Sequence, residues 1–198
     1  MSNPDQSQQQ LASVERRLDA VQAAMNERGL KATEGVEELS HVVQESWLPI
    51  NGARVVAKAW ADPAFRTRLM ANGIQAVAEL GLTMPKHHRH LVALENPPGV
   101  HNVICCTLCS CTALSIIGVP PDWYKSLDYR ARIVRESRTV LKEMGLDLAP
   151  GIELRVWDTT ADTRYMVLPE RPAYTAGWNE EQLAAIVTRD GMIGVTQL

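Results

Sequence analysis

The sequence has no large excess of charge of either sign and no long apolar run. Its 198 residues include 20 Lys or Arg and 23 Asp or Glu, which gives a net charge of −3. Because such a chain attracts neither nucleic acid nor an anionic membrane, we expect neither as a partner. The start, MSNPDQSQQQ, lacks the basic and apolar regions of a signal peptide, and no segment is apolar over the length that spans a bilayer. These absences predict a cytoplasmic protein.

Motifs of several common enzyme classes are also missing. The sequence contains no Gly-rich phosphate-binding loop and no Gly-x-Ser-x-Gly nucleophile motif. Helical patterns come early and strand patterns later, without regular alternation, which predicts an α+β fold rather than a doubly wound sheet. The length suffices for one domain with a hydrophobic core, plus an appendage.

The N-terminal segment has apolar residues at spacings of three and four, namely Leu11, Val14, Leu18, Val21 and Met25. This spacing predicts an amphipathic helix, whose apolar stripe covers either its own domain or another subunit. We therefore predict an N-terminal helical arm over residues 1–40 and a main domain over residues 41–198.

Helix signals recur along the main domain. Asp62 followed by Pro63 predicts the start of a helix, because Asp caps helices and Pro is favoured in the first turn. A helix is also predicted over residues 129–144. Asn179 and Gln182 have the spacing of a capping box, which predicts a last helix through EEQLAAIVTRD.

Strand signals appear in three segments, residues 89–96, 152–158 and 164–172. The last two segments are close in sequence, so we expect their strands to pair with each other. Residues 96–102, NPPGVHN, are expected to form a loop that leads into a cluster of cysteines.

All four cysteines lie in ICCTLCSC, residues 104–111. Disulfides this close in sequence constrain the unfolded chain little, so a disulfide framework is disfavoured. A zinc site is a stronger alternative, because Cys106, Cys109 and Cys111 offer three sulfurs and zinc takes four ligands. His101, Cys105 or a histidine of KHHRH could supply the fourth ligand. The usual zinc signature, however, has two separated ligand pairs.

The spacing of the three cysteines also fits a different metal. If their sulfurs surround one ion, the backbone turns inward and brings the peptide nitrogens of Ser110 and Cys111 beside it. Amide nitrogen binds only after it loses its proton, which requires a strongly polarising, preferably trivalent ion. Sulfur and nitrogen ligands together favour cobalt or iron. Three sulfurs and two nitrogens leave the sixth octahedral position open, as a Lewis-acid catalyst needs.

The segment CTLCSC resembles the metal-binding motif of nitrile hydratase α subunits and of the metal-bearing subunit of thiocyanate hydrolase. Four further segments occur in the order found in that family: ARVVAKAWADP, GVPPDWYKSLDYRAR, RVWDTTADTRYMVLPERP and IVTRDGMIGV. The resemblance extends over residues 52–196, and several long motifs in register are far more specific than one short motif. It argues against zinc and implies a layered α-β-β-α domain with a claw-like cysteine loop, residues 106–111.

The resemblance also implies the metal ligands. They are the sulfurs of Cys106, Cys109 and Cys111 and the main-chain nitrogens of Ser110 and Cys111. Thr107 stands where iron-containing members tend to have serine, which implies low-spin Co(III), with Fe(III) as the alternative. Oxidation of Cys109 to sulfinic acid and of Cys111 to sulfenic acid is implied as well.

The implied reaction is hydration of a small-molecule nitrile to its amide, with the metal withdrawing electron density from the nitrile. Three residues are candidates for catalysis. Cys111 carries the sulfenate oxygen, the hydroxyl of Ser110 orients water or substrate, and Arg164 stabilises the oxygenated sulfurs through charge-assisted hydrogen bonds.

One segment departs from the family pattern. Members usually continue from the last cysteine as CYPWP or CTAWP, whereas this chain reads CTALS, so that Leu114 replaces a tryptophan and Ser115 a proline. Thr112 and Leu114 are expected to line the substrate pocket, and loss of the indole widens that pocket. We therefore expect a bulky nitrile of heteroaromatic or nucleoside-like character.

The resemblance further implies partners. Two more arginines come from a β subunit in the family, so we expect nitrile hydratase β-type subunits in a hetero-oligomer. An activator or metallochaperone protein is expected to insert the metal, since trivalent cobalt exchanges ligands slowly. Two alternatives stay open: the metal subunit of a thiocyanate hydrolase, and a non-catalytic metal-binding protein.

Overall fold

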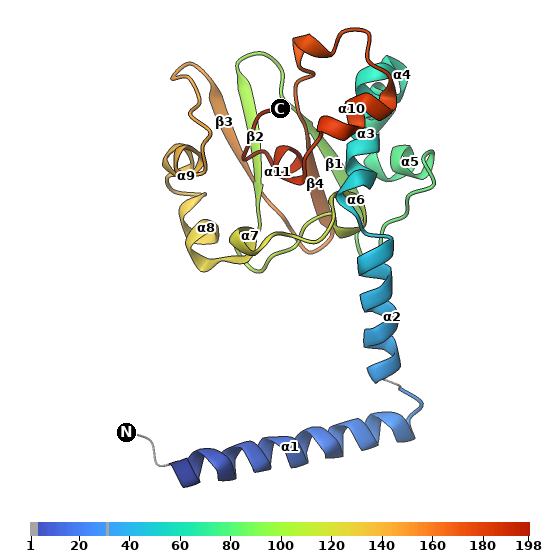
Figure 1. Ribbon diagram of the computed structural model, residues 1–198, viewed down its shortest axis with the longest axis vertical. Helices are drawn as coiled ribbons and strands as arrows, with labels where there is room; N and C mark the ends of the chain where they lie inside the picture. Colours follow the sequence, from blue (N-terminus) through green and yellow to red (C-terminus); the bar gives the residue numbers. More distant parts are fainter. Residues whose placement is uncertain (1–3, 31) are drawn as a thin grey trace. The chain divides into compact units, whose positions relative to one another are not determined.

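The computed structural model describes residues 4–30 and 32–198 and divides into two units, Met1–Val42 and Val43–Leu198. The first unit contains α1 (Pro4–Glu27) and most of α2 (Ala32–Glu45) (Figure 1). No helix in the described part of the chain is both long enough and apolar enough to cross a membrane.

The helix predicted from the N-terminal apolar stripe is confirmed by α1. Val14, Leu18 and Val21 are each more than half exposed on it. The side chain of Leu11 lies outside the described residues. The predicted boundary between residues 40 and 41 and the docking of this stripe on another subunit stay predictions.

Among the described residues, the second unit contains the end of α2, the helices after it and four strands. In chain order they are α3 (Pro49–Ala61), α4 (Pro63–Ala71), α5 (Gly73–Ala78), β1 (His90–Glu95), β2 (Val100–Cys105), α6 (Leu114–Ile117), α7 (Asp122–Lys125), α8 (Leu127–Arg132), α9 (Ser137–Glu143), β3 (Glu153–Asp158), β4 (Thr163–Leu168), the 3-10 helix η1 (Ala173–Thr175), α10 (Glu180–Ile186) and α11 (Arg189–Ile193).

The strands form two separate two-stranded sheets, and both are parallel. β1 pairs with β4, and β2 pairs with β3. The three predicted strands are confirmed by β1, β3 and β4. The prediction that residues 96–102 form a loop is wrong from residue 100 onward, because β2 begins there. The sequence VHNVIC does not alternate strictly between apolar and polar residues. This strand is buried along nearly its whole length, so it does not need one polar face.

The expected pairing of β3 with β4 is also wrong. The short connections 96–99 and 159–162 each join strands of different sheets. β4 is mostly buried, whereas every residue of β3 is either exposed or half-buried. Pairing β4 with β1 places β4 in the interior. We attribute the pairing of β4 with β1 to this burial of apolar surface, because it outweighs the local preference for a β3–β4 hairpin.

Helices cover the two sheets on opposite sides. α4 and α5 pack on β1, α9 packs on β3, and α11 contacts both β2 and β4. Figure 1 shows α8 and α9 beside β3, with α3, α4 and α5 beside β1 at the other side. The predicted α+β class and the layered α-β-β-α arrangement are therefore confirmed.

Two helix predictions hold at their starts. The side chain of Asp62 accepts hydrogen bonds from the N–H groups of Ala64 and Phe65 and caps α4. Asn179 and Gln182 form a complete capping box at the start of α10. The last helix is shorter than predicted, because α10 ends at Ile186 and α11 begins separately.

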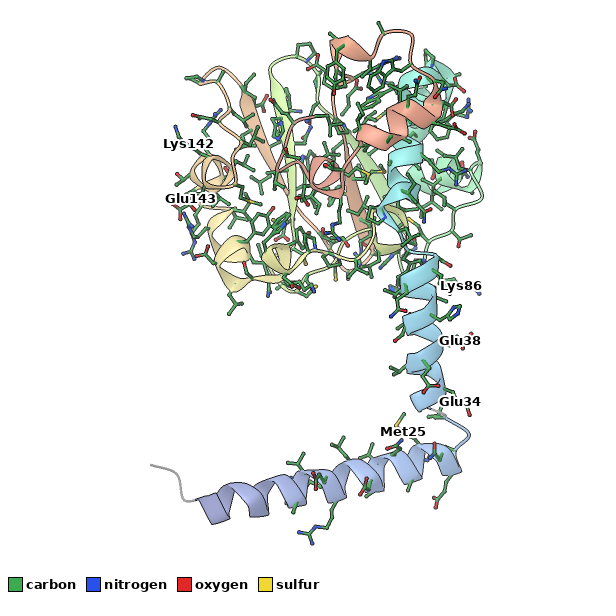
Figure 2. The ribbon with its side chains drawn as sticks, viewed as in Figure 1. Met25, Glu34, Glu38, Lys86, Lys142 and Glu143 are labelled. Carbon is green, nitrogen blue, oxygen red and sulfur yellow. The ribbon has the colours of Figure 1, made fainter. Side chains whose placement is uncertain are left out.

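The predicted helix over residues 129–144 is broken into α8 and α9. The chain turns at residues 133–136, where the N–H groups of Arg135 and Glu136 donate to the carbonyl oxygen of Arg132. This turn allows both Ile133 and Leu141 to be fully buried. Figure 2 shows Lys142 and Glu143 on the outer side of α9, where both are exposed.

Candidate metal centre

The cysteine loop, residues 106–111, directly follows β2. The last residue of β2, Cys105, lies opposite Asp158, the last residue of β3. The cysteine loop therefore emerges at the carboxyl end of a parallel strand pair. Loops at this end of parallel strands commonly form ligand sites, because rigid strands fix their positions.

The three cysteine sulfurs of this loop converge. The Sγ–Sγ distance is 3.2 Å between Cys106 and Cys109 and 2.8 Å between Cys109 and Cys111. All three Sγ atoms lie within 4.8 Å of one another, a separation at which they can share one metal ion. Cys106 is buried, Cys111 is half-buried and Cys109 is exposed, so the site is open to solvent at Cys109.

The fourth ligand required by a zinc site is not supplied within the described part of the chain. The only group of three or more potential ligands there consists of the three cysteines. The Nε2 atom of His101 lies 2.7 Å from the carbonyl oxygen of Gly194 instead. Burial raises the pKa of the Cys105 thiol to about 12, which keeps it a neutral thiol. A closed four-ligand zinc site therefore does not fit these residues.

The main-chain N–H groups of Ser110 and Cys111 influence the thiol of Cys109. Burial acts to raise the pKa of the Cys109 thiol, but hydrogen bonds outweigh it and lower that pKa. The donors include the thiols of Cys111 and Cys106 and the main-chain N–H groups of Cys111 and Ser110. The role of the Ser110 and Cys111 nitrogens as metal ligands stays a prediction. Burial and the bond to Cys109 raise the pKa of Cys111 to about 12.

Residues from other elements hold the cysteine loop in place. The carboxylate of Asp158 accepts from the N–H of Thr107 at 2.9 Å and from its hydroxyl at 2.5 Å. Arg130 donates to the carbonyl oxygens of Cys106 and Thr107. The hydroxyl of Tyr124 donates to the carbonyl oxygen of Cys111.

Asp158, Arg130 and Tyr124 were not identified from the sequence as site residues. They lie inside segments that carry the family resemblance, but nothing in those segments shows which loop atoms they contact. Tyr124 is fully buried even though it has a hydroxyl, which requires a hydrogen-bond partner.

Arg164 lies on β4 and is only 4% exposed. Its Nη1 atom donates to the carbonyl oxygens of Thr160 and Thr163, at 2.6 and 3.1 Å. Its Nε has no hydrogen-bond partner among the described residues. The positive charge of Arg164 acts to lower the pKa of Cys111. A buried guanidinium with an unused donor can bind an additional anionic oxygen at this place.

His88 adds a second buried polar group beside Arg164. It is 4% exposed, and its Nδ1 also lacks a hydrogen-bond partner among the described residues. Burial, followed by the charges of Arg164 and His87, lowers the pKa of His88 to about 4. The ring is therefore neutral at neutral pH. The sequence KHHRH marked this histidine only as one alternative zinc ligand.

The two residues predicted to line the substrate pocket differ in exposure. Leu114, at the start of α6, is half-buried, whereas Thr112 is buried and its hydroxyl is 3.5 Å from the carbonyl oxygen of Gly118. Ser115 is buried, and its hydroxyl has no partner among the described residues. Leu114 is thus the more accessible of the two predicted pocket residues.

Two exposed leucines lie in and beside the cysteine loop. Leu108 is 87% exposed and Leu127 is 77% exposed. A hollow of about 220 Å³ lies at Leu127 and is lined by Thr107, Leu127, Arg130, Ala131, Val134 and Arg135. Exposed apolar residues around a hollow are typical of surfaces that bind another protein.

Comparison with known proteins agrees with this geometry. The family described as "Nitrile hydratase, alpha chain" matches residues 12–196. The low-molecular weight cobalt-containing nitrile hydratase subunit alpha of Rhodococcus rhodochrous is 44% identical over 180 residues, 91% of this chain and 86% of that protein. Thiocyanate hydrolase subunit gamma of Thiobacillus thioparus is 43% identical over 157 residues, 74% of this chain and 65% of that protein.

A solved structure is also similar. A double mutant of the Fe-type nitrile hydratase from Comamonas testosteroni Ni1 has a TM-score of 0.86 and 56% sequence identity, covering 94% of this chain and 91% of that one. The similarity extends over nearly the whole chain and includes the cysteine loop. The chain therefore belongs to the nitrile hydratase alpha chain family.

Proposed function

We propose that this chain is the metal-carrying alpha subunit of a nitrile hydratase, which hydrates a nitrile to the amide at a low-spin Co(III) centre. One observation carries the proposal: three cysteine sulfurs converge within 4.8 Å on a loop fixed at the carboxyl end of β2 and β3. Family membership over residues 12–196 supports it.

The proposed ligands are the sulfurs of Cys106, Cys109 and Cys111 and the main-chain nitrogens of Ser110 and Cys111. When bound, the trivalent ion supplies a Lewis acid that polarises the nitrile. Thr107 and the cobalt-containing relatives favour cobalt. Iron is the second candidate, because the similar solved structure at 56% identity is an Fe-type enzyme.

In this proposal the protein side chains position the reacting groups. Cys109 and Cys111 carry oxygen atoms on sulfur, and the unused Nε donor of Arg164 binds one of these oxygens. The Ser110 hydroxyl orients water or substrate. The low exposure of Arg164 strengthens its hydrogen bonds, because little water competes for them.

A β-type subunit is the proposed partner of the surface beside the cysteine loop. The exposed side chains of Leu108 and Leu127 would be covered by it, which removes apolar area from water. An activator protein is proposed to deliver the metal. A thiocyanate hydrolase subunit is the alternative function, supported by 43% identity to one such subunit. A non-catalytic metal-binding protein is the third possibility.

The proposal is tested by expressing the chain with a β-type subunit in medium supplemented with cobalt or with iron. Elemental analysis should give about one metal ion per chain, and the mass of the peptide containing residues 106–111 should show added oxygen. The purified complex should then convert nitriles to amides. Turnover of thiocyanate instead would favour the alternative. Zinc without added oxygen, in a folded complex, would contradict the proposal.

The substrate proposed for this centre is a bulky heteroaromatic or nucleoside-like nitrile, since Leu114 stands in place of a tryptophan. Replacing Leu114 with tryptophan should lower kcat/KM for a bulky nitrile by about tenfold or more and change that for a small aliphatic nitrile by less than about threefold. The ratio of the two constants within one preparation controls for metal content. A wild-type complex that turns over only small aliphatic nitriles would show that the proposed substrate class is wrong.

A further inference from the structure

We infer that Arg130 is a positioning residue that holds the cysteine loop in the shape that captures metal. This inference rests on the metal site proposed above. Arg130 belongs to α8 and is half-buried. Its Nε donates to the carbonyl oxygen of Cys106 at 3.1 Å, and its Nη2 donates to the carbonyl oxygen of Thr107 at 2.7 Å.

These two bonds fix successive peptide groups at the start of the cysteine loop. On the other side, Asp158 accepts from the N–H and the hydroxyl of Thr107. Thr107 is therefore held by a cation from α8 and an anion from β3. The segment between Cys106 and Cys109, whose sulfurs lie 3.2 Å apart, has little freedom to open.

Holding the loop in this way should increase its affinity for metal. Fixing the backbone of a flexible residue costs conformational entropy. If Arg130 orders the cysteine loop before the metal binds, this entropy is already lost in the metal-free protein. It then does not weaken metal binding. The guanidinium is suited to the task because its planar donors reach two neighbouring carbonyl oxygens at once, whereas a lysine ammonium lacks this fixed geometry.

The neighbouring Arg132 shows what a purely structural arginine does on the same helix. It bonds only to carboxylates, those of Asp128, Glu136 and Glu143. These contacts join α8 to the end of α9 and do not reach the cysteine loop. Arg132 is therefore a matched control, since its loss should affect stability without affecting the loop.

The experiment uses the full-length chain under reducing conditions and Co²⁺ alone as the probe. Wild type, Arg130→Met, Arg130→Lys and Arg132→Met are titrated with Co²⁺, with the thiolate-to-cobalt absorption as the signal and a chelator in competition. Arg130→Met should raise the Kd about 10- to 100-fold, the usual effect of losing a residue that orients metal ligands. Arg130→Lys should fall between Arg130→Met and wild type.

Thermal unfolding and cysteine alkylation separate positioning from general stability. Arg130→Met should speed alkylation of Cys109, while Arg132→Met should lower the Tm but keep the Kd within about twofold of wild type. A folded Arg130→Met protein with the wild-type Kd would overturn the inference and leave the metal site intact. If Arg130→Met does not fold, a wild-type Kd for Arg130→Lys overturns it equally. If neither the wild-type chain alone nor the chain expressed with a β-type subunit in cobalt-supplemented medium holds cobalt, the proposed metal site itself is wrong.

Discussion

Replacing Cys109 with serine is expected to abolish stoichiometric metal binding. The Cys109 sulfur lies between the other two, 3.2 Å from that of Cys106 and 2.8 Å from that of Cys111. The main-chain N–H groups of Ser110 and Cys111 also act to lower the pKa of its thiol. A serine hydroxyl is a harder and much less acidic ligand than a thiol and suits cobalt or iron poorly.

The expected size of this effect follows from the energy of known sites. Structural metal sites with four ligands bind with apparent free energies of about 10–16 kcal/mol, so that one ligand contributes about 3 kcal/mol, or more than about a hundredfold in Kd. Elemental analysis of the complex expressed with a β-type subunit should find metal in wild type and almost none in Cys109→Ser.

Cys105→Ala is the matched control for this substitution. Cys105 is fully buried in the core, and burial raises the pKa of its thiol to about 12. It immediately precedes the cysteine loop but has no part in the proposed ligand set, so the variant should keep its metal. Full metal content in Cys109→Ser, or loss of metal in Cys105→Ala, would contradict the assignment of the ligands.

Replacing Arg164 with methionine is expected to lower kcat about 10²- to 10³-fold, the usual cost of removing one preorganised donor to developing negative charge. KM and metal content should change little, because Arg164 is proposed to bind oxygen on sulfur rather than the metal or the ground-state nitrile. Steady-state kinetics and elemental analysis of the complex with a β-type subunit measure both quantities.

Arg155→Met, a substitution on β3, is the control for Arg164→Met. Arg155 is exposed and forms an ion pair with Glu153, and such surface pairs contribute little. Its loss should alter kcat by less than about twofold. A normal kcat for Arg164→Met would refute the proposed role. If a loss of metal or of thermal stability accounts for the lower rate, Arg164 has a structural role instead.

Local sequence was sufficient for features that depend on neighbouring residues. The capping box of Asn179 and Gln182 and the cap at Asp62 were predicted correctly, because each is complete within four residues. The convergence of Cys106, Cys109 and Cys111 was likewise predictable, since three sulfurs within six consecutive residues can reach one ion whatever the surrounding fold.

Tertiary structure decided how the strands pair and what surrounds the cysteine loop. β3 and β4 do not pair with each other, because the choice between a local hairpin and two parallel ladders depends on how much apolar surface the whole domain buries. Arg130 and Asp158 reach Thr107 from 23 and 51 residues away. Only the packing of α8 and β3 around β2 brings the charges of Arg130 and Asp158 to Thr107. No local sequence pattern specifies contacts between residues so far apart in the chain.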